Sequence, residues 1–399
     1  MTHILYISYD GMLEPLGQSQ VLAYLKRLAN GRRIHLISFE KADDWANEAE
    51  RVRLARDIAS AGIAWHPLRY HKTPSVLATA FDIMQGIIVG VWLCVRYKIK
   101  IIHARSYIPS VIALTLKKLF NVKYIFDMRG FWADERIDGG LWPKGGRIYR
   151  VAKWFEKRFL LSADSVVSLT NAAVDEMKKF DYLQGRLPNF KVITTCTDLN
   201  LFDFKKTNIN NSSKESFVLG YVGSVGVWYL FDETLNCFKL ILEKVPSAQL
   251  HIINRGGHQY IRERLIDKRI NPNKVMIETS DHAGVAKAMQ SMDVGIFFIK
   301  PVYSKMSSAP TKLGEFLGCG IPCLSNTKVG DMAVILNDEK VGVALDSFDE
   351  TSMKLGIEEL MTLLNDPEIR ERCRSTALKY FSLDIGVRSY NHIYNRLIS

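Results

Sequence analysis

The sequence predicts an α/β protein with two Rossmann-like domains, each built on a parallel β-sheet. Short β-branched runs alternate with longer amphipathic runs along the 399-residue chain, and the alternation restarts near residue 218 after a polar stretch. Strands that alternate with helices are typical of parallel, doubly wound sheets, and a chain of this length can form two domains with separate cores. Because such sheets bind ligands beyond the carboxyl ends of their strands, we expect a substrate cleft between the domains.

Short apolar, β-branched runs predict six strands before the polar stretch and five after it. The first six are Ile4–Ser8, Ile34–Phe39, Ile101–Ala104, Lys123–Asp127, Ser165–Leu169 and Lys191–Thr194. The other five are Val218–Val222, Gln249–Ile253, Val275–Glu278, Val294–Ile299 and Ile321–Leu324. The stretches between them, such as 18–28 and 111–119, show the apolar spacing of helices.

The polar stretch 205–216 is interpreted as a linker, because it is rich in lysine, asparagine and serine. It separates an N-terminal domain, residues 1–204, from a C-terminal domain, residues 217–380. A final helical segment follows at 381–399.

Charge is distributed unevenly between the two halves. Residues 1–200 carry 29 Lys and Arg against 19 Asp and Glu, whereas the remainder carries 24 against 23. A basic first half predicts attraction to an anionic surface, with a merely basic, solvated surface as the alternative. No zinc knuckle, helix-turn-helix or stacking-aromatic signature is present, so nucleic acid is not an expected partner.

A membrane interface is the anionic surface that the local pattern favours. Lys98 and Lys100 stand beside Trp92 and Tyr97, directly after the apolar run 83–95. That run, of about 13 residues, is predicted to be too short to span a bilayer.

The start of the chain predicts the compartment. It enters a strand without a basic leader, so no secretory signal is expected. The six cysteines lack zinc-like pairing, and we expect Cys319 and Cys323 to pack in the core. We therefore expect a cytoplasmic protein, either soluble or located at the inner face of the cell membrane.

The most informative local pattern covers residues 307–322, SSAPTKLGEFLGCGIP. It predicts a short helix whose start is marked by serine and proline and whose end is Gly318 or Gly320. A helix N-terminus beside Lys312 is suited to a phosphate group, because free N–H groups and the positive end of the dipole point at the anion. One turn further on, the Glu315 carboxylate can accept hydrogen bonds from a ribose diol. The pattern therefore predicts a site for a nucleoside diphosphate.

Each half also opens with a strand and a glycine-containing loop. In the first loop, Gly17 would allow a bound group to approach the backbone, and Ser19 lies near a helix start; in the second, Gly223 follows the strand. Neither loop matches G-x-G-x-x-G or the Walker A pattern, which argues against hydride transfer and ATP hydrolysis. No D-x-D follows a strand and no G-x-S-x-G is present, so neither a magnesium site of that kind nor a serine nucleophile is predicted.

Charged residues follow several of the predicted strands, where α/β enzymes hold functional groups. Arg105 and Arg129 can bind a diphosphate or stabilise a leaving phosphate. Asp127 is either a cleft carboxylate or a helix cap, and His103 is either catalytic or part of the core. Arg255 supplies a further cation, or else belongs to a surface turn.

With these residues in place, the chain resembles the retaining glycosyltransferases of family 4, whose GT-B fold has two facing Rossmann-like domains. The resemblance covers essentially the whole chain and is strongest over 310–322, with support from Gly17, 221–224 and 390–397. It implies that the first domain binds the acceptor and the second binds a nucleoside-diphosphate sugar. It also implies that the segment 381–399 crosses back onto the first domain.

The resemblance assigns roles within the motif. Glu315 matches the second glutamate of the E-x7-E motif and is implied to bind the ribose hydroxyls. Ser307 stands where the first glutamate belongs, so Ser307, Ser308 or a backbone amide is expected to replace it. Arg129 lies in a D-x-R segment similar to that of family members from bacterial surface-polysaccharide pathways.

The second loop departs from the family pattern, because residues 225–229, after Gly223, include no arginine or lysine. We expect Lys312 to supply that charge to the diphosphate, together with Arg255, Lys300 or Lys305.

The resemblance implies transfer of a sugar from a nucleoside-diphosphate sugar to a hydroxyl of a lipid-linked or oligosaccharide acceptor, with retention, in cell-surface polysaccharide synthesis. No metal or other cofactor is expected. Contact with an anionic membrane is expected. The expected catalytic residues are Arg129, Lys312 and Glu315. The expected donor-binding residues are Gly17, Gly223, Ser224, Arg255, Ser307, Ser308, Thr311, Lys312, Leu313 and Glu315. The expected acceptor-side residues are Ser19, Arg105, Asp127 and Arg129.

Two alternatives stay open. One is a nucleotide-sugar 2-epimerase of the same fold, which would need acid/base carboxylates and histidines in its cleft. The other is a catalytically degenerate nucleotide-sugar-binding subunit, which Ser307 in place of glutamate would fit.

Overall fold

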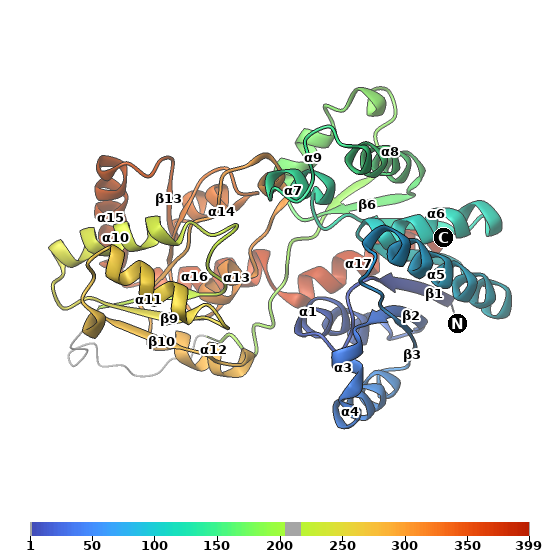
Figure 1. Ribbon diagram of the computed structural model, residues 1–399, viewed down its shortest axis with the longest axis horizontal. Coiled ribbons are helices and arrows are strands. Elements are labelled where there is room, and N and C mark those ends of the chain that lie inside the picture. Colours follow the sequence, from blue (N-terminus) through green and yellow to red (C-terminus); the bar gives the residue numbers. More distant parts are fainter. Residues whose placement is uncertain (1, 204–216, 399) are drawn as a thin grey trace. The chain divides into compact units, whose positions relative to one another are not determined.

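A computed structural model describes residues 2–203 and 217–398, which form two compact units (Figure 1). The first unit comprises the chain up to residue 194 together with the segment from 383 onward, and the second comprises 195–382. The final helix therefore belongs to the first unit. Residues 195–203 belong to the second unit, although the sequence analysis places them in the first. The predicted linker 205–216 lies outside the described residues.

The first unit is built on a seven-stranded sheet in the order β3-β2-β1-β4-β5-β6-β7. All neighbouring strands pair in parallel. The strands are β1 (Thr2–Ser8), β2 (Arg32–Glu40), β3 (Ile63–Arg69), β4 (Ile101–Arg105), β5 (Lys123–Asp127), β6 (Ser165–Ser168) and β7 (Phe190–Val192). The helices are α1 (Pro15–Gly17), a π-helix (Gln18–Leu22), α2 (Ala23–Leu28), α3 (Ala42–Ala46), α4 (Glu48–Ser60), α5 (Ser75–Tyr97), α6 (Tyr107–Phe120), α7 (Trp132–Asp138), α8 (Arg147–Ser162), α9 (Asn171–Met177), a 3-10 turn (Asp181–Leu183) and α17 (Leu383–Ile398).

The second unit is built on a six-stranded parallel sheet in the order β10-β9-β8-β11-β12-β13. The strands are β8 (Val218–Val222), β9 (Gln249–Ile253), β10 (Val275–Glu278), β11 (Val294–Ile296), β12 (Cys323–Asn326) and β13 (Gly342–Leu345). The helices are α10 (Phe231–Lys244), α11 (His258–Asp267), a 3-10 turn (Pro272–Lys274), α12 (His282–Met289), a 3-10 turn (Tyr303–Ser307), α13 (Thr311–Gly318), α14 (Met332–Asp338), α15 (Glu350–Leu364) and α16 (Ile369–Tyr380). The predicted fold, two Rossmann-like domains with parallel sheets, is confirmed.

The sequence analysis missed two strands, β3 and β13, and both lie at sheet edges. An edge strand has one neighbour and need not be a continuous apolar run. β3 contains Pro67 and is largely half-buried, while β13 has only four residues and begins with Gly342.

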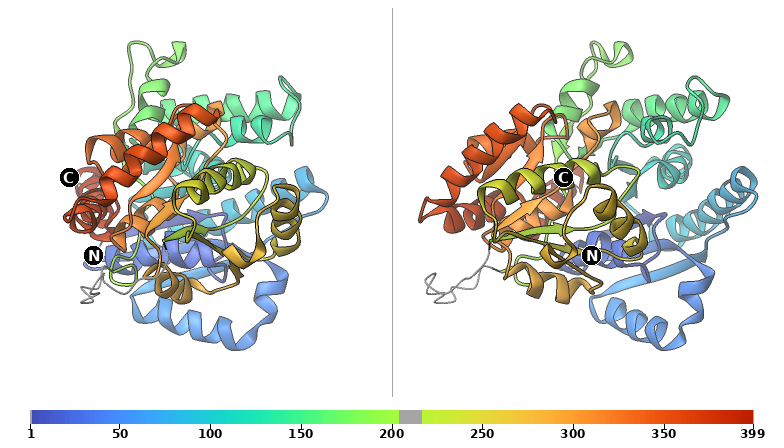
Figure 2. Two further views of the ribbon diagram at one scale, coloured as in Figure 1. Left: turned by 90° about the vertical axis from the view of Figure 1, so that its left-hand side faces the viewer. Right: turned by 60° about the vertical axis from the view of Figure 1, so that its left-hand side comes forward.

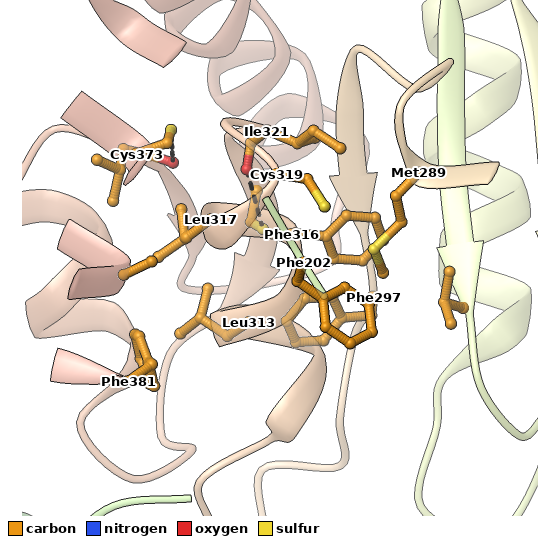
Figure 3. Close-up of a cluster of buried hydrophobic side chains, with 14 of the residues drawn as sticks. Phe202, Met289, Phe297, Leu313, Phe316, Leu317, Cys319, Ile321, Cys373 and Phe381 are labelled. Carbon is orange, nitrogen blue, oxygen red and sulfur yellow. Dashed lines mark hydrogen bonds between the residues drawn. The ribbon is translucent and has the colours of Figure 1, made fainter. Parts of the chain in front are cut away.

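Helix α13, which carries the motif, packs into the core of the second unit (Figure 3). The ring of Phe316 stacks on that of Phe297 at 6.4 Å. A Cβ atom on Gly295 of β11 would lie 2.6 Å from the Phe316 ring, so helix and sheet are in close contact. Cys319 and Cys323 are buried, as predicted.

The ends of α13 differ in part from the prediction. Its N-cap residue is Pro310, and no side chain of the described residues caps it, so neither serine does so. At the other end, Gly320 has φ 72° and the amides of Gly320 and Ile321 bond to the carbonyls of Leu317 and Phe316. This is a Schellman motif, in which the left-handed residue is normally glycine.

The apolar run 83–95 is the inner part of a longer helix. α5 has 23 residues, which by length and composition alone is sufficient to cross a membrane. The prediction that this segment is too short was therefore wrong, because the helix begins eight residues before the run, at Ser75.

Candidate active site

The carboxyl ends of β8 and β11 form the centre of the candidate donor site. The chain continues from β8 toward β10 on one side of the sheet, and from β11 toward β13 on the other. Loops that diverge at such a switch point leave a crevice between them, which is where open α/β sheets bind ligands. The loop that follows β8 begins at Gly223, the next residue along the chain.

Gly223 and Asn254 hold this crevice in shape. Gly223 has φ 121°, a region that favours glycine. The Asn254 side chain donates to the Gly223 carbonyl at 2.8 Å and accepts from the Gly257 amide at 2.6 Å. One buried amide therefore ties together the loops that follow β8 and β9.

Lys312, on the first turn of α13, extends toward Gly223 in the loop that follows β8. Its Nζ lies 3.8 Å from the ring centre of Tyr229, and Tyr221 and Phe297 supply two further rings at 5.5 and 5.3 Å. A Cβ atom on Gly223 would lie 2.7 Å from Nζ, so a side chain at that position would displace the end of the lysine. Within the described part of the chain Nζ has no hydrogen-bond partner, although the residue is only 7% exposed.

This environment disfavours the charged form of the lysine. Burial lowers the pKa of Lys312 to about 7, although the nearby Glu315 carboxylate acts in the opposite direction. Aromatic faces attract a cation but do not replace its hydration shell. An anion bound at Nζ would supply the missing charge and raise the pKa again.

Glu315 lies one turn after Lys312. Its carboxylate Oε1 is 3.5 Å from Nε2 of His282, at the start of α12, and its side chain is 11% exposed. The contact with Glu315 raises the pKa of His282. The sequence analysis missed His282, because it lies 33 residues away in the chain and carries no motif.

The other predicted donor residues occupy more varied environments. Ser224 and Arg255 are exposed on the loops after β8 and β9, whereas Ser308 and Thr311 are half-buried beside the start of α13.

Ser307 and Leu313 do not present free groups to a ligand. The Ser307 hydroxyl donates to the Ser304 carbonyl at 2.6 Å. The Leu313 side chain lies in the core, and its amide bonds to the Pro310 carbonyl. The Leu313 side chain, predicted for the donor set, is therefore not available to a ligand.

The first unit has its own switch point, between β1 and β4. Ser8 and Arg105 are register partners at the carboxyl ends of these strands. Arg105 is 5% exposed, and its Nε lies 3.1 Å from the Asp10 carboxylate. The predicted cation is therefore present at the expected edge, already paired.

Asp127, at the carboxyl end of β5, joins a buried polar network. Its Oδ2 accepts from the Tyr390 hydroxyl at 2.9 Å and lies 3.4 Å from His103 Nε2, while His103 Nδ1 is 2.7 Å from the Tyr394 hydroxyl. Burial raises the pKa of Asp127, but the positive charge of Arg129 and the contact with His103 outweigh it and lower the pKa to about 2. Asp127 does not cap α7, whose N-cap residue is Phe131.

His103 belongs to the core rather than to an exposed catalytic group. It is 1% exposed, and both ring nitrogens are engaged. The two tyrosines, Tyr390 and Tyr394, come from α17. They are 263 and 291 residues away in the chain from their partners Asp127 and His103, so the final helix completes this network.

Arg129 follows β5 in a strained conformation. Its φ is 57° and the next residue, Gly130, has φ 126°. A non-glycine residue in the left-handed region costs energy and tends to occur where function requires it. The half-buried Arg129 is thus held beside Asp127 by the backbone.

Gly17 and Ser19 have local roles. A Cβ atom on Gly17 would lie 2.0 Å from the Gly11 carbonyl oxygen, so the group that approaches this glycine is the loop's own backbone. The Ser19 hydroxyl donates to the Pro15 carbonyl at 2.9 Å. Gly17, predicted for the donor set, lies in the first unit.

Within residues 2–203 and 217–398, no group of three or more His, Cys, Asp or Glu side chains is placed to hold a metal ion.

Family models match both units. Residues 203–380 match the model described as "Glycosyl transferases group 1", and residues 19–186 match "Glycosyl transferase 4-like domain". Comparison with curated protein sequences found no significant match.

Solved structures with the same fold cover the whole chain. A glycosyltransferase from Rickettsia africae has a TM-score of 0.74 at 14% identity, over 100% of this chain and 99% of that one. Sucrose-phosphate synthase from Thermosynechococcus elongatus has 0.71 at 14% identity, over 100% and 99%. Anabaena HepE, in complex with UDP, has 0.65 at 14% identity, over 99% and 100%. At this identity the likeness shows the fold, and the two family models add the class. The chain belongs to the glycosyltransferases of GT-B fold.

Proposed function

We propose that this protein transfers a sugar from a nucleoside-diphosphate sugar to a hydroxyl group of a glycan acceptor, with retention of the anomeric configuration. The observation that carries the proposal is the buried ammonium group of Lys312, which lacks a hydrogen-bond partner among the described residues. A buried charge without a partner destabilises a protein. Lys312 lies at the switch point of an open parallel sheet, which is where such sheets bind ligands. An anion bound there would explain the buried ammonium group.

The donor is proposed to lie along the start of α13. Its diphosphate would meet Lys312 and the positive end of the helix dipole. Its ribose hydroxyls would donate to Glu315. The likeness to Anabaena HepE supports a nucleotide-sugar donor, since HepE is known in complex with UDP and with UDP-glucose.

The chemical step needs negative charge to be stabilised on the departing diphosphate. The bond from the anomeric carbon to the phosphate oxygen breaks, and a bond to the acceptor oxygen forms on the same face of the sugar. The acceptor proton passes to the departing phosphate oxygen, so neither a protein base nor a metal is required. Lys312 and Arg129 are the proposed electrostatic groups.

The acceptor is proposed to be a lipid-linked glycan of cell-surface polysaccharide synthesis, met on the cytoplasmic side of the membrane. Support comes from the excess of basic residues in 1–200 and from Arg105 and Asp127 at the carboxyl edge of the first sheet. The same charge supports peripheral contact with anionic lipid.

A nucleotide-sugar 2-epimerase is the second candidate. The pair Glu315 and His282 is a carboxylate–histidine contact of the kind that acid/base chemistry uses. Incubation with UDP-N-acetylglucosamine in the absence of acceptor distinguishes an epimerase from a glycosyltransferase, because only an epimerase would form a new sugar epimer.

The direct test is a thermal-shift screen of the intact protein against UDP, GDP, ADP, CMP and dTDP and their common sugars. A ligand that binds only the folded state raises its stability, so one nucleotide should raise the Tm selectively. The selected donor is then assayed with polyprenyl-diphosphate-linked glycans, and NMR of the product reads the anomeric configuration. If no nucleoside diphosphate shifts the Tm, or if the product is inverted, the proposal is wrong in its donor site or in its stereochemistry, respectively.

A further inference from the structure

We propose that the outer faces of α5 and α8 form the surface by which the first unit binds an anionic lipid bilayer, with α5 lying in the plane of the membrane rather than across it. The inference rests on the membrane contact included in the proposed function and names the residues that make it. It does not depend on the donor site, which lies in the second unit.

Helix α5 exposes one continuous apolar stripe. Six large apolar side chains recur at intervals of three or four residues, which places them on one face. They are Leu77 (69% exposed), Phe81 (43%), Met84 (51%), Ile88 (62%), Trp92 (52%) and Val95 (65%). At 1.5 Å per residue the helix is about 35 Å long, so the stripe is an extended surface rather than a single exposed side chain.

The opposite face of α5 is tightly packed against its own unit. Cβ atoms on Gly86 and Gly90 would lie 2.4 and 2.6 Å from side-chain atoms of Ile112 and Leu116 in α6. The two helices therefore touch with little space between them, side by side in Figure 1.

A buried carboxylate on that inner face excludes a spanning arrangement. Asp82 is fully buried, and it accepts from the Tyr9 hydroxyl at 2.8 Å and from the His71 backbone amide at 3.1 Å. Its other oxygen lies 2.6 Å from His71 Nδ1. Moving α5 across a bilayer would break these bonds and bring Asp82 into hydrocarbon. An amphipathic helix with one packed and one apolar face instead lies at the interface.

Basic residues stand at both ends of the stripe. Lys72 precedes the helix, Arg96 lies in its last turn, and Lys98 and Lys100 follow it, all exposed. The helix itself contains no acidic residue other than the buried Asp82. This combination of apolar centre and cationic ends is complementary to the acyl boundary and anionic headgroups of a bilayer.

Helix α8 repeats the pattern. Ile148, Val151 and Trp154 are exposed at intervals of three residues, at 48%, 54% and 51%. Four exposed basic side chains accompany them: Arg147, Arg150, Lys157 and Arg158. The Arg158 guanidinium lies over the Trp154 ring at 4.9 Å. Helix α6 packs against both α5 and α8, so the three helices are neighbours in the first unit (Figure 2).

Charge favours a lipid surface over a second copy of this chain. If two α5 helices packed antiparallel, Lys72 of one copy would meet Arg96, Lys98 and Lys100 of the other. If they packed in parallel, like groups would again face each other. Either arrangement brings like charges together, whereas an anionic headgroup layer neutralises all of them.

The test is co-sedimentation of the full-length protein with vesicles of phosphatidylglycerol, compared with vesicles of phosphatidylcholine. Ile88→Glu places a charge in the stripe, and Leu355→Glu is the matched control, since Leu355 is also 62% exposed but lies in the second unit. We expect Ile88→Glu to weaken binding at least about tenfold and Leu355→Glu to leave it unchanged. The double variant Arg147→Glu/Arg150→Glu should weaken binding by more than about tenfold through α8, and high salt should weaken that of the wild type.

Three results would overturn the inference. The first is equal vesicle binding by Ile88→Glu and Leu355→Glu. The second is a dimer in the wild type that Ile88→Glu converts to a monomer, which would assign the stripe to a second copy. The third is membrane-bound protein that resists extraction at alkaline pH, which would mean that α5 spans. The thermal shift with nucleotide reports the donor site separately, so failure of the membrane surface and failure of the donor site are distinguishable.

Discussion

Replacing Lys312 with methionine should stabilise the protein and abolish its response to nucleotide. Methionine keeps the linear shape of the side chain and makes favourable contacts with aromatic rings, here Tyr229, Tyr221 and Phe297. It removes the ammonium group, which is buried without a hydrogen-bond partner among the described residues. Stability and donor binding should therefore change in opposite directions.

The magnitude follows from proton linkage. Burial lowers the pKa of Lys312 from 10.5 to about 7. Between these two values the unfolded chain binds more protons than the folded one, so stability is full above pH 10.5 and is lost as the pH falls toward 7. At pH 7 the loss is on the order of 4 kcal/mol. Lys312→Met removes this loss, which corresponds to roughly 10 °C in the Tm of a unit of this size.

The assay is thermal unfolding at pH 7 with and without the nucleoside diphosphate selected by the screen. Lys239→Met is the matched control, because Lys239 is exposed on α10 of the same unit. We expect Lys312→Met to raise the Tm and to show no nucleotide-dependent shift, and Lys239→Met to behave as the wild type. A Lys312→Met protein that is less stable than the wild type, or that still responds to nucleotide, would refute the reasoning.

Four further predictions concern the two units. The affinity of the wild type for nucleotide should fall as the pH rises, by nearly tenfold per pH unit above about pH 7, because the diphosphate binds the protonated form of Lys312. Calorimetry in buffers of different ionisation enthalpy should detect the proton uptake that accompanies binding. Glu315→Gln should keep the fold and weaken nucleotide binding by about 1–3 kcal/mol, measured by the same titration, whereas an unchanged affinity would remove Glu315 from the ribose site. Gly223→Ala should destabilise the second unit and abolish the nucleotide-dependent thermal shift, because its Cβ would lie 2.7 Å from Nζ at a φ of 121°; a full shift would contradict the placement of the lysine. Tyr390→Phe should lower the free energy of unfolding by about 1–3 kcal/mol, since it removes the shorter of the two hydrogen bonds to the buried Asp127 Oδ2 and leaves only the longer contact with His103; denaturant titration against an exposed control such as Tyr303→Phe measures this.

Local patterns were sufficient for the alternation of strands and helices. Eleven of the thirteen strands among the described residues were predicted, because each coincides with a short apolar or β-branched run that is visible without knowledge of its neighbours. β3 and β13 were missed: β3 contains Pro67 and is largely half-buried, and β13 has only four residues and begins with Gly342. Edge position alone is not the reason, because the edge strands β7 and β10 were predicted.

The candidate site likewise combines features that are visible in the sequence with features that only the packing of the chain determines. The segment 310–322 could be singled out from the sequence, because a proline, a lysine, a glutamate and a closing glycine at helical spacing predict a short helix, which the structure has as α13. The anion site at the start of that helix stays a prediction. The sequence spacing does not show that the Ser307 hydroxyl bonds within its own turn. Nor does it show that the Leu313 side chain belongs to the core, because both facts depend on contacts made in the folded protein.

By itself the sequence determined the class of protein, the order of its elements and the helix that carries Lys312 and Glu315. These are local properties, set by the apolar period and by residues within a few positions of one another. Only the tertiary structure decided that aromatic rings surround Lys312, that α17 brings Tyr390 to Asp127, and that one face of α5 is left exposed. The reason is physical: burial, desolvation and exposure depend on which distant segments pack together, and a pattern along the chain does not specify that.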